Sequence, residues 1–180
     1  MFYSTTCPSP VGRLTMASDG TSLVGLWLDG QKYFLDTLTE TPVLLDELAV
    51  FDATRGWLDR YFAGKQPSPA ELPLTPIGNE FRHAVWRCLC DIPYGEVTTY
   101  GAISTRVAAM LGRTSMSAQA VGGAVGHNPI SIIIPCHRVV GSSGNLTGYA
   151  GGIDKKIQLL TFEGCAVENG KLRSTRGGKS

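Results

Sequence analysis

Residues 128–140 read NPISIIIPCHRVV, and this stretch decides how the second half of the chain is built. The apolar run from Ile130 to Ile134 has the length of a short buried strand. Pro135 is predicted to end that strand, because proline cannot donate to a sheet ladder. Cys136 follows at once, ahead of a loop region rich in glycine and serine. A cysteine in this position is firmly held and still accessible, as a nucleophile has to be.

The reactivity of Cys136 depends on its neighbours. The attacking species is the thiolate, and a free thiol with a pKa of about 8.5 is mostly protonated at neutral pH. His137 or Arg138 could supply a base or a positive charge. Adjacent side chains of an extended segment point to opposite sides, however, so sequence adjacency does not by itself bring the imidazole to the sulfur. For the Cys-His dipeptide taken alone, a structural role is the favoured interpretation.

Upstream of this stretch, the spacing predicts two helices joined by a short connection. Thr98 or Thr99 is a suitable N-cap for a helix from residue 100 to about residue 111. Residues 112–116 form the predicted connection, and a second short helix follows over 118–126. Two helices joined in this way resemble a helix-turn-helix.

The second predicted helix, which Ser117 would cap, has almost no side-chain bulk. It holds Gly122, Gly123 and Gly126 among alanines. Glycine inside a helix costs about 1 kcal/mol relative to alanine, so this composition needs a cause. Close packing against another helix is one explanation, and close approach of the backbone to a ligand such as DNA is the other. The sequence favours neither.

The first third of the chain has the pattern of a small antiparallel sheet. Strand-like runs over 11–18 and 21–28 flank an Asp-Gly turn, which is a strong hairpin signal. A helical pattern follows over 44–62, and Gly64 is placed to end it. Because no titratable groups cluster here, we expect this part of the chain to be a scaffold.

Four prolines from residue 67 to residue 76 mark a connector, which places a domain boundary near residue 76. A helix is predicted over 81–89. A last helix is predicted to be capped by Asp154 and stopped by Gly164.

Charge is unevenly distributed along the 180 residues, whose formal net charge is only +1. Residues 1–75 carry five Lys/Arg and nine Asp/Glu, whereas residues 76–180 carry eleven and six. A basic C-terminal half indicates a polyanionic partner. A basic tail without a partner is the alternative, because the last ten residues hold four of these positive charges.

The lengths of the apolar runs and the number of cysteines indicate where in the cell the protein lies and whether its thiols are reduced. No apolar run reaches the roughly 20 residues that span a bilayer, and the first residues lack a signal-peptide pattern. We therefore expect a cytoplasmic protein, or a nuclear one if the host has a nucleus. The five cysteines form no paired C-x-x-C pattern and cannot all pair, so reduced thiols and no metal are expected.

Residues 128–140 strongly resemble the active-site signature of the O6-alkylguanine-DNA alkyltransferases, the methylated-DNA–protein-cysteine methyltransferases. Further blocks similar to this family occur in the family's order: IPYGEVTTY at 92–100, AVGGA at 120–124, GYAGG at 148–152 and LLTFEG at 159–164. The hairpin region matches the family's N-terminal domain more weakly.

The resemblance implies a role for each residue of the catalytic group. Cys136 is the implied acceptor of the alkyl group, His137 takes its proton through a water molecule, and Glu163 orients the imidazole. Asn128 steadies the loop that carries Cys136. Tyr100 hydrogen-bonds the flipped guanine and donates a proton as the base leaves.

The resemblance also implies how the guanine is held. The carbonyl groups of Cys136 and Val139 accept hydrogen bonds from its amine, and the amide of Ala150 donates to O6. Tyr149 lines the pocket, with Lys156 near it. No cofactor is implied, because the sulfur itself receives the alkyl group.

The implied partner is double-stranded DNA carrying O6-alkylguanine, bound by a monomer. O6 lies inside the duplex, so the nucleotide has to be flipped out. The family does this from the minor groove, with the helix that here carries Gln119, Ala120, Gly122 and Gly123. Gln119 departs from the family's usual arginine, and the connection before it, 107–116, is longer than in many members.

The predicted function is therefore DNA repair by direct damage reversal, in which a methyl or other alkyl group moves once from O6 of guanine to Cys136. Repair of O4-alkylthymine is left open. A thiol hydrolase, which would turn over, is one alternative. A non-catalytic protein that binds alkylated DNA is the other, although such relatives carry tryptophan where this chain has Cys136.

The predicted fold is α+β with two domains and a tail. Residues 1–75 form a small antiparallel-sheet scaffold, which the resemblance makes ribonuclease-H-like. Residues 76–168 form a catalytic and DNA-binding helix-turn-helix domain of winged-helix type. Residues 169–180 are a basic tail that we expect to be disordered.

Overall fold

The hairpin predicted for the first third of the chain is confirmed. Strands β2 (Leu14–Ser18) and β3 (Leu23–Leu28) pair antiparallel. Asp19 holds their turn, since its Oδ1 accepts hydrogen bonds from the backbone N–H groups of Thr21 at 2.9 Å and Ser22 at 2.8 Å. The turn is therefore determined by residues next to one another in the sequence.

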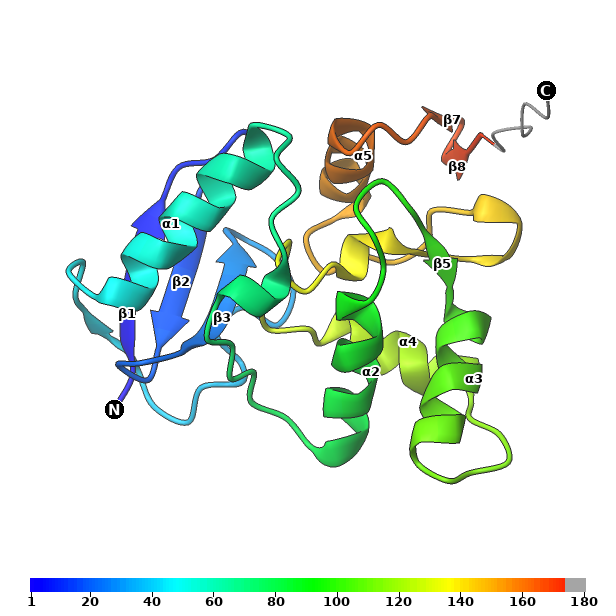
Figure 1. Cartoon of the computed structure of the whole chain (residues 1–180), viewed down its shortest axis with the longest axis horizontal. Helices are drawn as coiled ribbons and strands as arrows, with labels where there is room; N and C mark the ends of the chain where they lie inside the picture. The colour runs from blue at the N-terminus through cyan, green and yellow to red at the C-terminus, as the bar shows by residue number, and fades with distance from the viewer. Residues whose placement is uncertain (174–180) are drawn as a thin grey trace.

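Two further strands complete the sheet in this computed structural model, which describes residues 1–173. Strand β1 (Tyr3–Cys7) pairs antiparallel with β2, and the short β4 (Val43–Leu44) pairs parallel with β1, which gives the order β3-β2-β1-β4. Helix α1 lies across one face of the sheet (Figure 1). Neither β1 nor β4 was predicted.

The helix predicted over 44–62 begins later than expected. Helix α1 covers Ala49–Phe62, and Gly64 follows it with φ +78°. The leucines at 44 and 45 are exposed and lie at the edge of the sheet instead. The backbone N–H of Val43 donates to Phe2, just before β1, and that of Leu45 donates to Ser4 in β1, so sheet pairing satisfies this segment before the helix starts.

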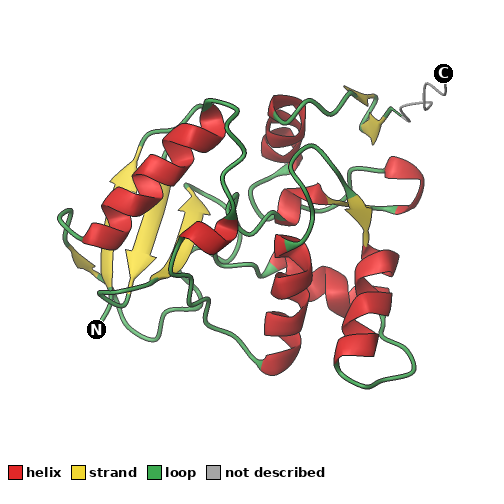
Figure 2. Ribbon diagram, in the orientation of Figure 1, coloured by secondary structure: helices red, strands yellow, loops and turns green. Residues whose placement is uncertain are grey.

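The helix-turn-helix is also confirmed. Helices α2 (Glu80–Cys90), α3 (Tyr100–Met110) and α4 (Ala118–Gly126) pack against one another, apart from the sheet (Figure 2). Each is capped by the side chain before it, since Asn79, Thr99 and Ser117 accept hydrogen bonds from backbone N–H groups of the first turn. Trp86 joins α2 to α4 by donating from Nε1 to the carbonyl of Ala124 at 2.9 Å.

The strand predicted from Ile130 to Ile134 is wrong. Apart from one bridge between Ile130 and Leu26, these residues form tight turns, with Ile132 at φ +71°. They are nevertheless among the most buried of the chain, at 2% exposure or less. A continuous apolar run indicates burial but does not distinguish a strand from a buried turn.

Two predictions for the C-terminal segment also need correction. Helix α5 (Ile153–Phe162) is preceded by Gly152 at φ +92° as its N-cap, and Asp154 lies in the first turn instead of capping it. Strands β7 (Val167–Glu168) and β8 (Lys171–Leu172) form a hairpin, so residues 169–172 are not disordered. The rest of the predicted tail, 174–180, lies outside the described residues.

The remaining elements are short. Strand β5 (Thr98–Thr99) pairs parallel with β6 (Val139–Val140), and three turns of 3-10 helix are η1 (Pro69–Glu71), η2 (Cys136–Arg138) and η3 (Ser142–Gly144). No helix within residues 1–173 is long and apolar enough to cross a membrane.

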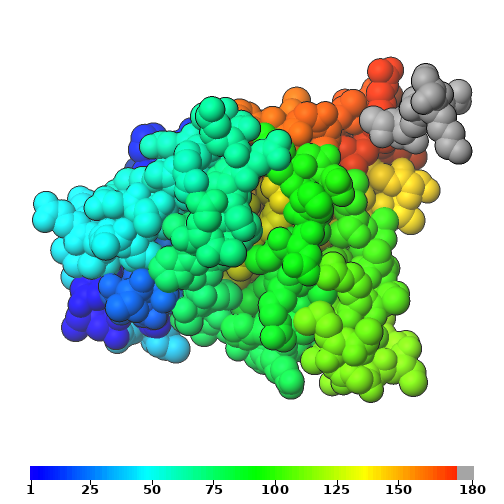
Figure 3. Space-filling model, viewed as in Figure 1, coloured from blue at the N-terminus to red at the C-terminus, as the bar shows by residue number. Residues whose placement is uncertain are grey.

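The sheet lobe and the helical lobe share one hydrophobic core and are in contact along their boundary (Figure 3). Backbone hydrogen bonds cross the boundary at Leu26, whose N–H donates to the carbonyl of Pro129 and whose carbonyl accepts from Ser131, each at 2.8 Å. Strand β3 therefore holds the segment that leads to Cys136.

Leu26→Ala should lower the free energy of unfolding by about 2–5 kcal/mol, because it leaves a cavity where the two lobes meet. Leu26 is fully buried. Urea denaturation measures the change. The control is Leu44→Ala in the same sheet, which removes a leucine that is 82% exposed and should cost no more than about 0.5 kcal/mol. Equal losses in the two variants would contradict the shared core.

Candidate functional site

Cys136 opens the 3-10 helix η2. Its backbone N–H donates to Ile134 at 2.8 Å, and that of Arg138 donates to Pro135 at 3.0 Å. Side chains of a 3-10 helix follow one another by about a third of a turn, so neighbours do not alternate as they do in a strand. An extended segment would point the side chains of Cys136 and His137 to opposite sides. In the 3-10 helix they do not point to opposite sides, so both can belong to one site.

A cavity of about 330 Å³ lies over Cys136, within the range of small-molecule pockets. Both lobes and the loop at 147–150 contribute to its wall, whose residues are Lys32, Tyr33, Tyr100, Gly122, Val125, Gly126, Cys136, Thr147, Gly148, Tyr149 and Ala150. Of the residues to which the resemblance assigns a role, five are in this wall: Tyr100, Gly122, Cys136, Tyr149 and Ala150.

Lys156 and Val139 lie beside the pocket instead of in its wall. The Nζ of Lys156 is buried and donates to the carbonyls of Val139 at 2.5 Å, Gly148 at 3.2 Å and Thr147 at 3.4 Å. This ammonium therefore joins η2 and β6 to the loop that forms the pocket wall. Burial lowers the pKa of Lys156 to about 8.

The thiol of Cys136 is only 5% exposed, and burial raises its pKa. A hydrogen bond with Asn128 and the charge of Lys156 oppose the rise without cancelling it. Asn128 also closes the turn before the cysteine, because its Nδ2 donates to Ile134 at 2.8 Å and its Oδ1 accepts from Ile130 at 3.0 Å. The resting thiol is therefore protonated, and its reaction requires a base.

His137 has the properties of that base. It is fully buried, and burial lowers the pKa of its imidazole, although Glu163 opposes the shift. Its Nε2 lies 2.7 Å from Glu163 Oε1. Since the carboxylate can only accept, Nε2 carries the hydrogen and Nδ1 carries the lone pair. Nδ1 is buried and has no hydrogen-bond partner among the described residues, so it is free to accept a proton.

Glu163, the C-cap of α5, accepts five hydrogen bonds. They come from Tyr61, Gly95, His137 and, twice, Arg138, at 2.7 to 3.1 Å. Burial alone would raise the pKa of this carboxyl, but His137 and Arg138 outweigh it and hold the pKa well below its usual range. Glu163 lies at the C-terminal end of α5, where the helix dipole disfavours a negative charge. The buried guanidinium of Arg138 offsets this effect.

Three of the residues that bond Glu163 were not predicted from the sequence to do so. Arg138 was considered only as a neighbour of the thiol, and Tyr61 only as an apolar residue of a helix. Gly95 ends the Pro-Tyr-Gly turn at 93–95, within the block quoted at 92–100, and its φ of +77° and a Cβ position only 3.0 Å from the Glu163 carbonyl oxygen favour glycine. The Pro-Tyr-Gly turn was the one available signal, and it did not reveal its partner.

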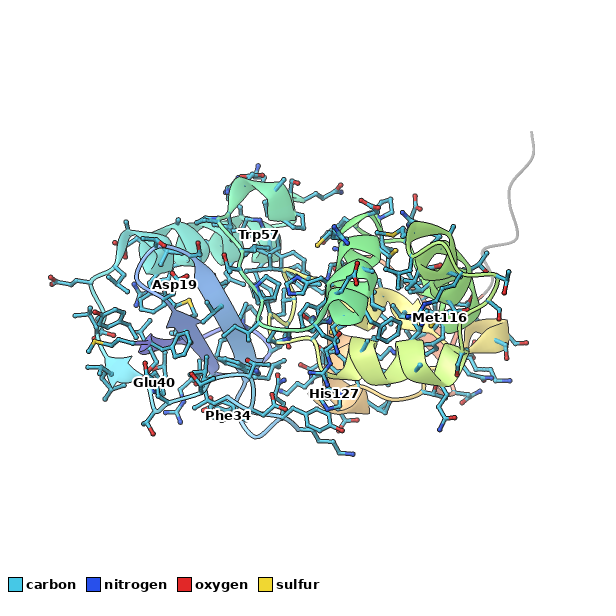
Figure 4. All side chains as sticks on the ribbon, turned by 90° about the horizontal axis from the view of Figure 1, so that it is seen from below. Asp19, Phe34, Glu40, Trp57, Met116 and His127 are labelled. Atoms are coloured by element: carbon cyan, nitrogen blue, oxygen red, sulfur yellow. The ribbon has the colours of Figure 1, made fainter. Side chains whose placement is uncertain are left out.

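The expected scaffold also reaches the pocket. Lys32 donates from its backbone N–H to the carbonyl of Ala150 at 2.9 Å. The ring of Tyr33 stacks on His127 at 3.8 Å between centroids. His127 ends α4 and lies where the two lobes meet, on the same side as Phe34 (Figure 4). These contacts depend on a loop with positive φ at Tyr33, for which the sequence carried no signal.

The remaining residues singled out from the sequence lie outside the pocket wall. Gln119, Ala120 and Gly123 are exposed on α4. Within residues 1–173, no three His, Cys, Asp or Glu side chains are grouped so that they could hold a metal ion.

Fold and site together define a two-lobed α+β protein in which a helix-turn-helix lobe carries a buried cysteine, histidine and glutamate beside a pocket. Residues 1–76 match the ribonuclease-like domain of 6-O-methylguanine DNA methyltransferase, and residues 80–165 match its DNA binding domain. The chain therefore belongs to the family of methylated-DNA–protein-cysteine methyltransferases, and the predicted fold class is confirmed.

Individual relatives agree. The methylated-DNA–protein-cysteine methyltransferase of Haemophilus influenzae is 42% identical over 161 residues, which cover 89% of this chain and 86% of the relative. That of Mycobacterium tuberculosis is 41% identical over 163 residues, or 91% and 93%. The crystal structure of Mycobacterium tuberculosis OGT in complex with DNA has a TM-score of 0.76 at 39% identity, covering 89% and 92% of the two chains.

Glu163→Gln should destabilise the protein most at neutral pH. The folded-state pKa of Glu163 lies below its unfolded value, about 4.3, so the stabilising contribution is complete above roughly pH 5 and is lost as pH falls towards the folded value. At pH 7 the loss should be about 3–5 kcal/mol, because Arg138 stays buried without its carboxylate.

Urea denaturation of wild type and variant at pH 7, 5, 4 and 3 measures this difference, which should shrink towards acid. Glu168→Gln is the control, since it breaks an ion pair with Arg173 in which both side chains are more than half exposed, at 55% and 68%. It should change stability little at any pH. A difference for Glu163→Gln that is constant with pH would contradict the depressed pKa.

Proposed function

We propose that this protein repairs alkylated DNA by moving an alkyl group from O6 of guanine to the sulfur of Cys136, once per molecule. One observation carries the proposal: a buried cysteine forms part of a pocket wall, and the next residue is a neutral histidine bonded to a carboxylate. The names of the relatives, methylated-DNA–protein-cysteine methyltransferases, support the same reaction.

In the proposed reaction, the thiol proton of Cys136 passes through a water molecule to Nδ1 of His137. Glu163 keeps that nitrogen in the accepting tautomer and stabilises the imidazolium that forms. The sulfur attacks the alkyl carbon, the new S–C bond replaces the C–O6 bond, and the bonding electrons leave with guanine. The thioether has no route back to the thiol, so the protein acts once.

The departing guanine needs a proton, and Tyr100 is the proposed donor. Tyr100 lines the pocket, and burial raises the pKa of its phenol, so it remains protonated at neutral pH. The backbone of Cys136, Val139 and Ala150 is proposed to hold the base, with Tyr149 beside it. Donors that meet the leaving oxygen stabilise the charge that develops there.

The surface of α4 supports a close approach to DNA. A Cβ added at Gly123 or Gly126 would meet nothing within 4 Å, and one at Gly122 would meet only the ring of Tyr100 at 3.8 Å. Packing within the protein therefore does not require these glycines. The favoured explanation is that the minor groove of DNA approaches this helix, with Gln119 and Ala120 on the same surface.

We extend the proposal to the organisation of the chain. Residues 1–75 act as the supporting domain, and residues 76–168 carry catalysis and DNA binding. The proposed partner is double-stranded DNA carrying O6-alkylguanine, bound by a monomer in the cytoplasm, or in the nucleus of a eukaryotic host.

Incubation with excess O6-methylguanine DNA should place one methyl group on Cys136 and then stop. Intact mass and peptide mapping give the stoichiometry and the position. Cys136→Ala should abolish transfer while DNA affinity, which depends mostly on phosphate contacts, stays nearly unchanged and falls with rising salt. Repair of more than one lesion per molecule would contradict the single-use reaction, and methylation of the Ala variant would contradict the acceptor.

Gln119→Arg should speed the repair of duplex DNA several-fold. The space left by a flipped guanine has to be filled, and unstacking costs a few kcal/mol. A planar guanidinium stacks on bases and is attracted to the minor groove, whereas glutamine is shorter and uncharged. Transfer from free O6-benzylguanine, which needs no flipping, is the internal control and should not change. An equal change in both rates would show that Gln119 does not act in flipping.

A further inference from the structure

The last turn of α1 brings a phenol from the sheet lobe to the catalytic carboxylate. The hydroxyl of Tyr61 donates to Glu163 Oε1 at 2.7 Å, in a buried hydrogen bond between residues 102 positions apart. Tyr61 is itself only 1% exposed. Arg138 also binds both oxygens of this carboxylate, so Tyr61 adds a contact from the sheet lobe to an ion pair formed within the helical lobe.

Tyr61 and His137 bond the same oxygen of Glu163. Oε1, which accepts from Tyr61, is also the oxygen that faces His137 Nε2 at 2.7 Å. Arg138 Nη2 donates to the same atom at 2.9 Å, so the phenol and the guanidinium both draw electron density away from the oxygen that faces the imidazole. Burial, and then the charge of Glu163, raise the pKa of Tyr61 far above neutrality, so the phenol stays a donor over the whole working range of pH.

The ring of Tyr61 is held independently of its hydroxyl. It stacks on Trp57 with centroids 5.5 Å apart and planes at 10°, and it meets Phe62 edge-on at 4.9 Å. Tyr94 and Phe162 contact it from the helical lobe at 5.8 and 5.9 Å. Removal of the hydroxyl alone should leave this aromatic cluster in place.

We propose that Tyr61 is a positioning residue of the transfer reaction, which fixes Glu163 Oε1 against His137 and withdraws negative charge from that oxygen. The inference rests on the proposed function, in which His137 takes the thiol proton. It assigns the sheet lobe a direct influence on the chemistry of Cys136, beyond that of a scaffold.

The sign of the effect follows from the charge on Oε1. Without the phenol, more negative charge faces His137, the imidazolium is favoured, and the pKa of His137 rises. Below that pKa the base is protonated and cannot accept the thiol proton, so the acid limb of the rate profile moves to higher pH. The lost constraint on Oε1 also slows transfer at the plateau.

Other ionisable groups surround the pair, and none of them changes in the test variant. They are Tyr94 from the turn before β5, Cys136 and Arg138 from η2, Tyr149 from the pocket loop, Lys156 from α5 and Cys165 after α5. A shift of the acid limb can therefore be assigned to the one hydroxyl removed.

The experiment compares Tyr61→Phe with Tyr94→Phe, measuring benzyl transfer from free O6-benzylguanine between pH 5 and pH 9. Tyr94 carries a hydroxyl in the same cluster that bonds the Phe162 carbonyl and not Glu163. Tyr61→Phe should slow the plateau roughly fivefold, the factor for one ordinary hydrogen bond, and move the acid limb to higher pH. Tyr94→Phe should match wild type in both.

A second replacement covers the case in which Tyr61→Phe does not fold. Incorporation of 3-fluorotyrosine at position 61 keeps the ring and the hydrogen bond but makes the phenol more acidic and a stronger donor. The acid limb should then move to lower pH.

The outcomes separate the two proposals. If the wild-type protein transfers no benzyl group, the proposed function fails. If it transfers normally, and Tyr61→Phe matches Tyr94→Phe in plateau and pH profile, or the fluorotyrosine protein matches wild type, then Tyr61 has only a structural role and this inference alone is wrong.

Discussion

Five hydrogen bonds converge on the carboxylate of Glu163, and they come from three separate segments of the chain. Helix α1 brings Tyr61, the turn before β5 brings Gly95, and η2 brings His137 and Arg138. A buried charge is tolerated only where it is paired and fully hydrogen-bonded. The need to satisfy this one anion therefore fixes how the sheet lobe, the cysteine turn and the last helix sit against one another.

The same burial sets the state of the reactive groups before substrate arrives. It raises the pKa of the thiol of Cys136 and lowers that of the imidazole of His137, so the proton stays on sulfur and the base stays neutral. For a protein that we propose is consumed by a single reaction, a protonated and enclosed thiol limits reaction with anything but a ligand that fills the pocket. In the proposed reaction the carboxylate of Glu163 stabilises the imidazolium that forms when His137 accepts the proton.

The pocket and the surface proposed to face DNA share the short helix α4. Helix α4 contributes Gly122, Val125 and Gly126 to the pocket wall, while Gln119 and Gly123 are exposed on the same helix. Such an arrangement places a base extruded from the duplex a short distance from Cys136. The sheet lobe closes the opposite side through Lys32 and Tyr33, so neither lobe alone forms the whole cavity.

The sequence by itself determined the features that depend on near neighbours. The Asp19 turn, the cap at Ser117 and the glycine at position 64 need only backbone groups within a few residues and were predicted correctly, and Thr99 is one of the two caps predicted for α3. The resemblance along residues 80–165 indicated the residues proposed to be catalytic, and the structure brings Cys136, His137 and Glu163 to one site. Only the tertiary structure shows that the apolar run after Pro129 is a turn and not a strand, because both bury the same side chains; the turn is recognised by the hydrogen bonds of Asn128 and by the positive φ of Ile132. The tertiary structure alone joined Tyr61 to Glu163, since a contact between residues so far apart depends on how two lobes pack, and no local pattern records that.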